Sequence, residues 1–275
     1  MKTKKIGFIG AGNMATSLIR GLIDSGLAAK HIWITDINPE AQQTLAHNLQ
    51  VNIATSNNDL VTQVDVVVLA VKPQVLHNVA TEVAEQINAQ NVLVVSIAAG
   101  ITQTSLQNWL GDAVAIVRCM PNTPALVLTG ATALHANANV TAEQRDLAEN
   151  ILRAVGISLW VESETELDAV TAVSGSGPAY YFLLMEAMEK AALALGLNSQ
   201  QARLLILQTA LGAAKIAMES NDTPEVLRQK VTSPGGTTQA ALQSFENNGF
   251  TSMVLEALQA AHDRSISMSK ELGAI

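Results

Sequence analysis

Cysteine is almost absent from this chain of 275 residues, which has one, Cys119. A single cysteine excludes a disulfide framework within the chain and is typical of proteins kept in a reducing compartment. Basic runs are missing as well, and the net charge of −8 argues against a surface for nucleic acid or for anionic membranes. We therefore expect a cytoplasmic protein that binds neither.

Long hydrophobic runs are absent too, since the longest, such as VDVVVLAV, are shorter than the ~18 residues of a membrane-spanning helix. After the basic start MKTKK, Gly10 and Gly12 interrupt the chain before an apolar stretch long enough for a secretion signal. No cluster has the spacing of metal ligands, and the glycine-rich loops hold no histidine. We expect neither a metal site nor a nucleophilic triad.

The composition changes near residue 163. Before it, short β-branched runs alternate with segments of helical length, and their continuous apolar character favours a parallel sheet covered on both faces. After it, the chain is rich in Ala, Leu, Glu, Gln and Met, which predicts helices. The expected strands lie in KKIGFI, HIWIT, VDVVVLAV, NVLVVSI, VAIVRCM, ATALH and SLWV, and the expected helices at about 165–195, 199–220, 223–231, 237–248 and 251–272.

The segment IGFIGAGNMA has the pattern of a dinucleotide-binding turn. Gly10 makes the tight turn, Gly12 lets the backbone approach a pyrophosphate, and the small Ala15 lets the helix pack closely on the strand. The next strand ends in Asp36, where an acid binds the ribose 2′-hydroxyl of NAD and repels the 2′-phosphate of NADP. The charge favours NADH, but Asn38 and Lys72 could shape the pocket differently, so the preference stays open.

We therefore predict an α/β Rossmann-type dinucleotide-binding domain over 1–163, followed by an all-α dimerisation and substrate domain over 164–275. The helical part is so poor in charge that we expect one of its faces to pack against another subunit. The alternative is that all of it packs within one chain.

Three further segments stand where ligands bind in such folds. Lys72 and Pro73 close VVVLAVKP, although Lys72 is equally well explained as a solvated lysine. In RCMPNTP, two prolines stiffen the loop around Asn122, or the segment is a plain connector. Near the other end, TSPGGTT at 232–238 opens a helix, where free N–H groups and the helix dipole favour an anion, or where glycines simply cap the helix.

The long helix after the sheet region begins VSGSGPAYYFLLMEAMEK. Where β-hydroxyacid dehydrogenases carry a catalytic lysine, this chain has Tyr180 and Tyr181, so alcohol oxidation lacks its base. A protonated imine fits better, because its carbon is already electrophilic and the site needs mainly orientation and an anchor.

The set GFIGAGNMA, AVKP, SIAAG, RCMPNTPA, VSGSGPAY and SPGGTT, in this order over almost the whole chain, resembles pyrroline-5-carboxylate reductase. The resemblance implies reduction of 1-pyrroline-5-carboxylate to L-proline by NADPH or NADH, the last step of proline synthesis. It also implies a homodimer joined through the helical domains and commonly built into a larger ring such as a decamer. The alternatives are a reductase of another cyclic imino acid, or a non-catalytic dinucleotide-binding sensor.

The resemblance also assigns roles to residues. Thr238 would be the catalytic residue, facing the ring nitrogen, and the SGSGP segment would kink the long helix near the substrate. The family often has a basic or small polar residue near Asp36, so the acid here is a departure that bears on cofactor preference. Substrate contacts are expected at Ser176, Ser233, Gly235, Gly236, Thr237 and Thr238. Cofactor contacts are expected at Ile9, Gly10, Gly12, Asn13, Met14, Asp36, Asn57, Ala70, Val71, Lys72, Pro73, Ala98, Met120 and Asn122.

Overall fold

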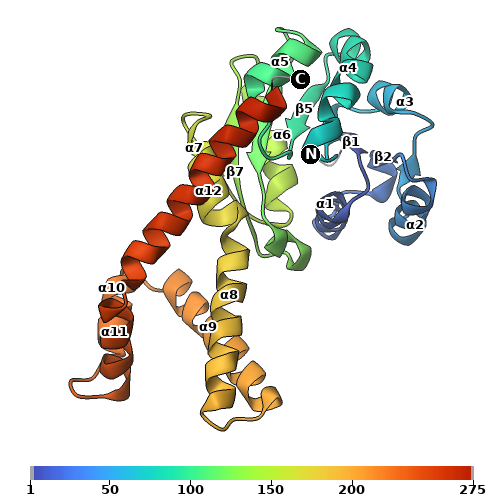
Figure 1. Cartoon of the computed structure of the whole chain (residues 1–275). Coiled ribbons are helices and arrows are strands. Elements are labelled where there is room, and N and C mark those ends of the chain that lie inside the picture. The colour runs from blue at the N-terminus through green and yellow to red at the C-terminus, as the bar shows by residue number, and fades with distance from the viewer. Residues whose placement is uncertain (1–2, 274–275) are drawn as a thin grey trace. The chain divides into compact units, whose positions relative to one another are not determined.

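The computed structural model describes residues 3–273, which form two compact units (Figure 1). The first runs to Ser176 and includes the chain from Ala260 on, and the second is Gly177–Gln259. The limits of these units differ from the predicted limits of 1–163 and 164–275. The reason is that the segments after residue 163, and the end of the last helix, pack on the sheet.

The first unit is built on one eight-stranded sheet in the order β3-β2-β1-β4-β5-β6-β7-β8. The strands from β3 to β6 are parallel, as predicted from their apolar runs. The strand bounds are β1 (Ile6–Ile9), β2 (Ile32–Thr35), β3 (Asn52–Ile53), β4 (Val66–Leu69), β5 (Leu93–Ser96), β6 (Ile116–Met120), β7 (Gly130–Ala136) and β8 (Gly156–Trp160).

The sheet departs from the predicted parallel arrangement at β7, which runs antiparallel to β6, while β8 is parallel to β7. Only a 3₁₀ turn, η2 (Thr123–Val127), joins β6 to β7, and so short a link cannot hold the crossover helix that a parallel pair needs. The two-residue β3 was not predicted, because it is too short to show a pattern.

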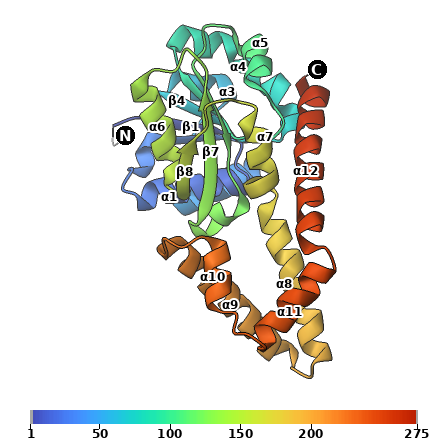
Figure 2. The same cartoon turned by 90° about the vertical axis from the view of Figure 1, so that its left-hand side faces the viewer.

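Helices cover both faces of the sheet, and successive residues of β4 point into two separate cores. One core lies under α1, α2 and α6, with α6 beside β8 (Figure 2), and the other lies under α3, α4 and α5. Burial on both faces explains why the strands are continuously apolar. The bounds are α1 (Asn13–Asp24), η1 (Ala29–His31), α2 (Pro39–Leu49), α3 (Asn57–Thr62), α4 (Pro73–Gln90), α5 (Gln103–Leu110), α6 (Ala142–Arg153) and α7 (Glu166–Val170).

The predicted helices after residue 198 are confirmed to within two residues. Thr223 accepts a hydrogen bond from the Val226 N–H (3.4 Å) with Pro224 at the first helical position, and Gly196 has a φ of +96° just after a helix. The predicted helix 165–195 is interrupted by a π turn, η3 (Thr171–Gly175). The other bounds are α8 (Gly177–Ala194), α9 (Ser199–Glu219), α10 (Pro224–Lys230), α11 (Thr237–Asn247) and α12 (Phe250–Gly273).

The second unit leaves much of its apolar surface uncovered. Of its described apolar side chains, Ala202 and Ile206 are buried, whereas Leu183, Leu211 and Leu255 are each more than 60% exposed. The apolar side chains of this unit therefore do not all pack within one chain, and the alternative is wrong. Exposed apolar surface of this extent is typical of a subunit interface.

Candidate dinucleotide and substrate sites

The turn between β1 and α1 depends on its two glycines for different reasons. Gly10 has a φ of +105°, and a Cβ placed there would lie 2.6 Å from the Ala70 carbonyl oxygen. Gly12 has an ordinary φ of −71°, and a Cβ there would meet nothing within 4 Å. The fold requires the first glycine, whereas the second leaves open space at the start of a helix.

That open space adjoins unpaired backbone donors. Gly12 is the N-cap of α1, and the first helical bond is from the Thr16 N–H to the Gly12 carbonyl oxygen (2.9 Å). Within the described part of the chain, no group accepts a hydrogen bond from the amides of Asn13 or Met14. A pyrophosphate fits such a position, because its oxygens can accept these bonds and its charge is favoured by the helix dipole.

Asp36, at the end of β2, is anchored to this turn. One carboxylate oxygen accepts from the Ala11 N–H (2.6 Å) and the other from the Asn38 N–H (2.8 Å). The Asn38 side chain is itself engaged, since its oxygen caps α2 through the amides of Glu40 and Ala41. Asp36 therefore has a fixed position beside the glycine turn.

A cavity of about 560 Å³ opens at the carboxyl ends of β1 and β2. Its volume is in the range of small-molecule and cofactor sites. Five of the expected cofactor residues line it, namely Ile9, Gly10, Asp36, Asn57 and Val71. The other lining residues are Thr35, Ile37, Gln42, Ala54, Thr55, Ser56, Val75, Asn78, Val79 and Glu82.

Asn57 joins two walls of the cavity. Its side-chain oxygen accepts from the Thr35 hydroxyl (2.7 Å), and its amide nitrogen donates to a carboxylate oxygen of Glu82 (2.9 Å). Sequence reasoning missed Glu82. The signal was available, because Val75, Val79 and Glu82 share one face of α4 at helical spacing.

Near the β4–α4 junction, Ala70 and Val71 are half-buried, and Pro73 begins α4. Lys72 is the exposed N-cap of that helix, and no carboxylate among the described residues pairs with it. Its assignment to the cofactor stays a prediction.

Met120 and Asn122 lie where β6 meets the π turn. The Asn122 amide nitrogen donates to the Ser174 carbonyl oxygen (3.1 Å), and its side-chain oxygen accepts from the Ala131 N–H (2.9 Å). Gly175 faces Met120, because a Cβ there would lie within 2.3 Å of the methionine methyl carbon. Asn122 thus holds the loop between two elements, whatever else it contacts.

The π turn confirms that the SGSGP segment disturbs the helix. The Ser176 N–H donates to the Thr171 carbonyl oxygen, five residues earlier in the chain (2.8 Å), and the hydroxyl of Ser176 has no partner among the described residues.

At the end of β5, Ser96 is buried and its hydroxyl accepts a long hydrogen bond from the Ala98 N–H (3.4 Å). Ala98 is buried as well.

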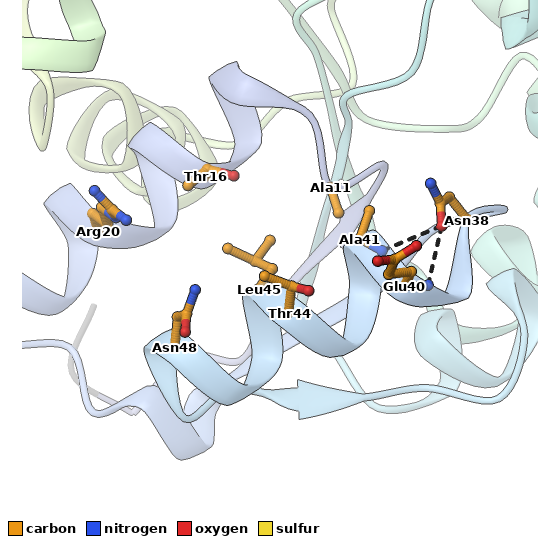
Figure 3. A pocket seen from close by; sticks show the side chains of 9 residues that line it. All are labelled: Ala11, Thr16, Arg20, Asn38, Glu40, Ala41, Thr44, Leu45 and Asn48. Atoms are coloured by element: carbon orange, nitrogen blue, oxygen red, sulfur yellow. Dashed lines mark hydrogen bonds between the residues drawn. The ribbon is translucent and has the colours of Figure 1, made fainter.

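A second, more open groove of about 420 Å³ lies between α1 and α2 (Figure 3). Thr16 and Arg20 line it from α1, and Thr44 and Asn48 from α2. It contains none of the expected contact residues.

In the second unit, the segment Thr232–Thr238, which the sequence predicts to bind an anion, does lead into a helix, α11. We call this segment the anion cradle. Gly235 has a φ of +72°, and Gly236 is the N-cap of α11 without a side-chain cap. The Gly235 N–H donates to the Gln239 side chain (2.5 Å) and the Gly236 N–H to the Ser233 carbonyl oxygen (3.0 Å), so these two donors are already used.

The amides and hydroxyls of Thr237 and Thr238 have no hydrogen-bond partner among the described residues, and they are free to bind a carboxylate. Ser176 belongs to the first unit and the Ser233–Thr238 segment to the second.

Within residues 3–273, no group of three or more His, Cys, Asp or Glu side chains could hold a metal ion, and no helix is long and apolar enough to span a membrane. Burial raises the pKa of the Cys119 thiol far above its ordinary value, which keeps it in the unreactive thiol form. The sheet, the glycine turn and the adjoining cavity are those of a dinucleotide-binding protein, here with a helical second unit.

Comparison with known proteins narrows this class to one enzyme family. A family model described as "Pyrroline-5-carboxylate reductase dimerisation" matches residues 164–268, and one described as "NADP oxidoreductase coenzyme F420-dependent" matches residues 5–100. The pyrroline-5-carboxylate reductase of Pseudomonas aeruginosa is 50% identical over 273 residues, which are 99% of this chain and 100% of that protein.

Two solved structures that resemble this chain belong to the same family. A pyrroline-5-carboxylate reductase from Coxiella burnetii has a TM-score of 0.93 at 43% identity, over 97% of this chain and 99% of that one. A pyrroline carboxylate reductase from Plasmodium falciparum, with NADP bound, has a TM-score of 0.87 at 30% identity, over 98% and 99%. The chain belongs to the pyrroline-5-carboxylate reductase family.

Proposed function

We propose that this chain reduces 1-pyrroline-5-carboxylate to L-proline with NAD(P)H, as the final step of proline biosynthesis. The observation that carries the proposal is the second anion cradle at α11, in a chain that shares the family over its full length. A protein that only bound a dinucleotide would need the turn at Gly12 but not this cradle.

The chain's own residues have separable tasks in this reaction. The bound NAD(P)H supplies a hydride. The amides of Asn13 and Met14 would hold its pyrophosphate, and the amides of Thr237 and Thr238 would hold the substrate carboxylate. The Thr238 hydroxyl, which has no partner among the described residues, would orient the protonated ring nitrogen.

Little acid–base chemistry is required of the protein. When hydride adds to the carbon of a protonated imine, the electron pair of the C=N bond moves to nitrogen and a secondary amine results. No alkoxide forms, so no general acid has to neutralise one. The rate enhancement then comes from orientation, for which effective molarities of ~10⁵ M or more are possible.

The helical unit makes the enzyme a homo-oligomer, as expected from its uncovered apolar surface and the match to a dimerisation model. We further propose that such dimers associate into a larger ring such as a decamer, in the cytoplasm. A mass measurement by light scattering on the purified protein tests the ring, because a dimer of 29.0 kDa chains and a decamer differ fivefold in mass.

The test of the function is loss of absorbance at 340 nm with 1-pyrroline-5-carboxylate, run with NADH and NADPH in parallel. The same assay with the six-membered piperideine carboxylate tests the nearest rival, since one methylene is discriminated by only ~1–3 kcal/mol. Nucleotide binding without turnover on either ring would refute the reductase and favour a sensor.

A further inference from the structure

The cavity at the ends of β1 and β2 is lined by two carboxylates and no cation. Asp36 and Glu82 are its charged residues, and no lysine, arginine or histidine is among the side chains that line it. An adenosine with a 2′-phosphate would bring to this cavity roughly 1.5 to 2 further negative charges at pH 7. Free ribose hydroxyls instead donate hydrogen bonds to carboxylates.

Both carboxylates are held in place. Asp36 is tied at one oxygen to the Ala11 N–H and at the other to the Asn38 N–H, at 2.6 and 2.8 Å. Glu82 receives the Asn57 amide at 2.9 Å, and Asn57 is in turn bonded by Thr35. Neither acid can turn away from an incoming phosphate without breaking hydrogen bonds that the fold already makes.

The basic residues His77, Arg20 and Lys72, on the elements around the cavity, are not part of its lining. His77 packs on Trp109, with the two ring centroids 5.0 Å apart. Arg20 lines the separate groove between α1 and α2 (Figure 3). Lys72 follows the lining residue Val71 but is exposed at the start of α4 and is not part of the lining. The described cavity therefore offers a 2′-phosphate no counter-charge.

We infer that Asp36, together with Glu82, makes this chain bind NADH in preference to NADPH. The inference rests on the proposed use of NAD(P)H and narrows it to one of the two nucleotides. A relative at 30% identity is solved with NADP bound, so the preference belongs to these side chains and not to the fold. The acids exclude the phosphate by charge and accept the hydroxyls in its place.

Direct binding tests this without any turnover. The Kd of NADH and of NADPH is measured from nicotinamide fluorescence, with no imine present, at about 0.05 M and about 1 M salt. For the wild type we expect NADH to bind about 10-fold or more tightly at low salt, because like charges repel. We expect the ratio to shrink at high salt, where the Debye length is only about 3 Å.

Two variants separate the local charge from net charge. Asp36→Asn should raise the affinity for NADPH and lower the ratio of the two Kd values about 5-fold or more. Glu40→Gln removes the same charge from an exposed position on α2 outside the cavity, and it should leave the ratio unchanged. Should Asp36→Asn not fold, Glu82→Gln provides the cavity variant.

Equal or tighter binding of NADPH by the wild type would overturn the inference, as would an unchanged ratio in the cavity variants. A selective loss of NADPH binding in Lys72→Gln would also overturn it, since that lysine would then supply the counter-charge. Failure of the proposed reductase activity is a separate result, because it appears as absent turnover while the ratio of Kd values stands.

Discussion

Replacing Gly10 and Gly12 one at a time should separate the needs of the fold from those of the ligand. In Gly10→Ala the residue must keep a φ of +105°, and its new Cβ would lie 2.6 Å from the Ala70 carbonyl oxygen. The left-handed backbone alone costs roughly 1–2 kcal/mol for a residue with a Cβ. The Ala70 oxygen belongs to backbone that is held at the end of a central strand, so it cannot move away cheaply.

We expect Gly10→Ala to lose about 3 kcal/mol of stability, of which the backbone strain is about half and the contact with Ala70 the rest. For a unit of this size, that loss lowers Tm by roughly 6–12 °C. Gly12→Ala meets nothing within 4 Å and keeps an allowed φ, so it should cost less than about 1 kcal/mol, from the weaker N-cap. Its Cβ instead fills the space that a pyrophosphate needs.

The assay is a thermal melt together with a nucleotide titration for each variant. Gly10→Ala should melt early, whereas Gly12→Ala should melt near the wild type and bind NADH or NADPH about 10-fold or more weakly, the effect of ~1.4 kcal/mol. Normal nucleotide affinity in Gly12→Ala would refute the placement of the pyrophosphate at this turn. Normal melting of Gly10→Ala would refute the steric argument.

Three further substitutions test other parts of the molecule. Thr238→Ala should lower kcat/KM about 10-fold or more through loss of a transition-state hydrogen bond of ~1.5 kcal/mol, whereas Thr238→Ser should retain most activity. Asn122→Ala should lower the free energy of unfolding by about 2–4 kcal/mol, since it leaves a backbone N–H and a carbonyl unpaired. Arg264 lowers the pKa of Glu271 through a hydrogen bond, so Glu271→Gln should melt below the wild type at pH 7.

The sign of the Glu271 effect follows from the direction of its pKa shift. A folded pKa below the unfolded value gives stability that is present above the unfolded value and lost as pH falls through the folded one. The melting difference between Glu271→Gln and the wild type should therefore vanish in acid and persist at neutral pH. A melting difference that grows in acid would contradict the role given to Glu271. Unchanged kcat/KM in Thr238→Ala would contradict the role of Thr238, and unchanged stability in Asn122→Ala that of Asn122.

The elements could be predicted from the sequence wherever burial leaves a periodic pattern. β4 is apolar at every position because its residues point alternately into two cores, and Thr223–Pro224 marks a helix start by its own chemistry. The reversed direction of β7 could not be predicted from the strand's own residues, since the apolar run ATALH has the same pattern in either orientation. The short link at η2 was the available clue.

The backbone geometry of the candidate site could be predicted only where one residue type has one physical task. The turn at Gly10 and Gly12 is such a place, and so is the start of α11. The role of Asn122 could not be predicted, because nothing about an asparagine in a loop indicates that its side chain bonds the backbone of both Ser174 and Ala131. Such bonds join segments far apart in the sequence and are visible only once the chain is folded.

The two units differ in where their stability comes from. The sheet unit buries Phe8, Leu69 and their neighbours within the chain, so it contains its own cores. The helical unit buries Ala202 and Ile206 but leaves most of its large apolar side chains exposed, so one chain gains little hydrophobic stabilisation there. We expect a second subunit to supply that stabilisation, so that assembly of the helical unit is part of its folding. Because the candidate substrate cradle at α11 lies in this unit, we expect its geometry to depend on assembly, and the dinucleotide turn to form within a single chain.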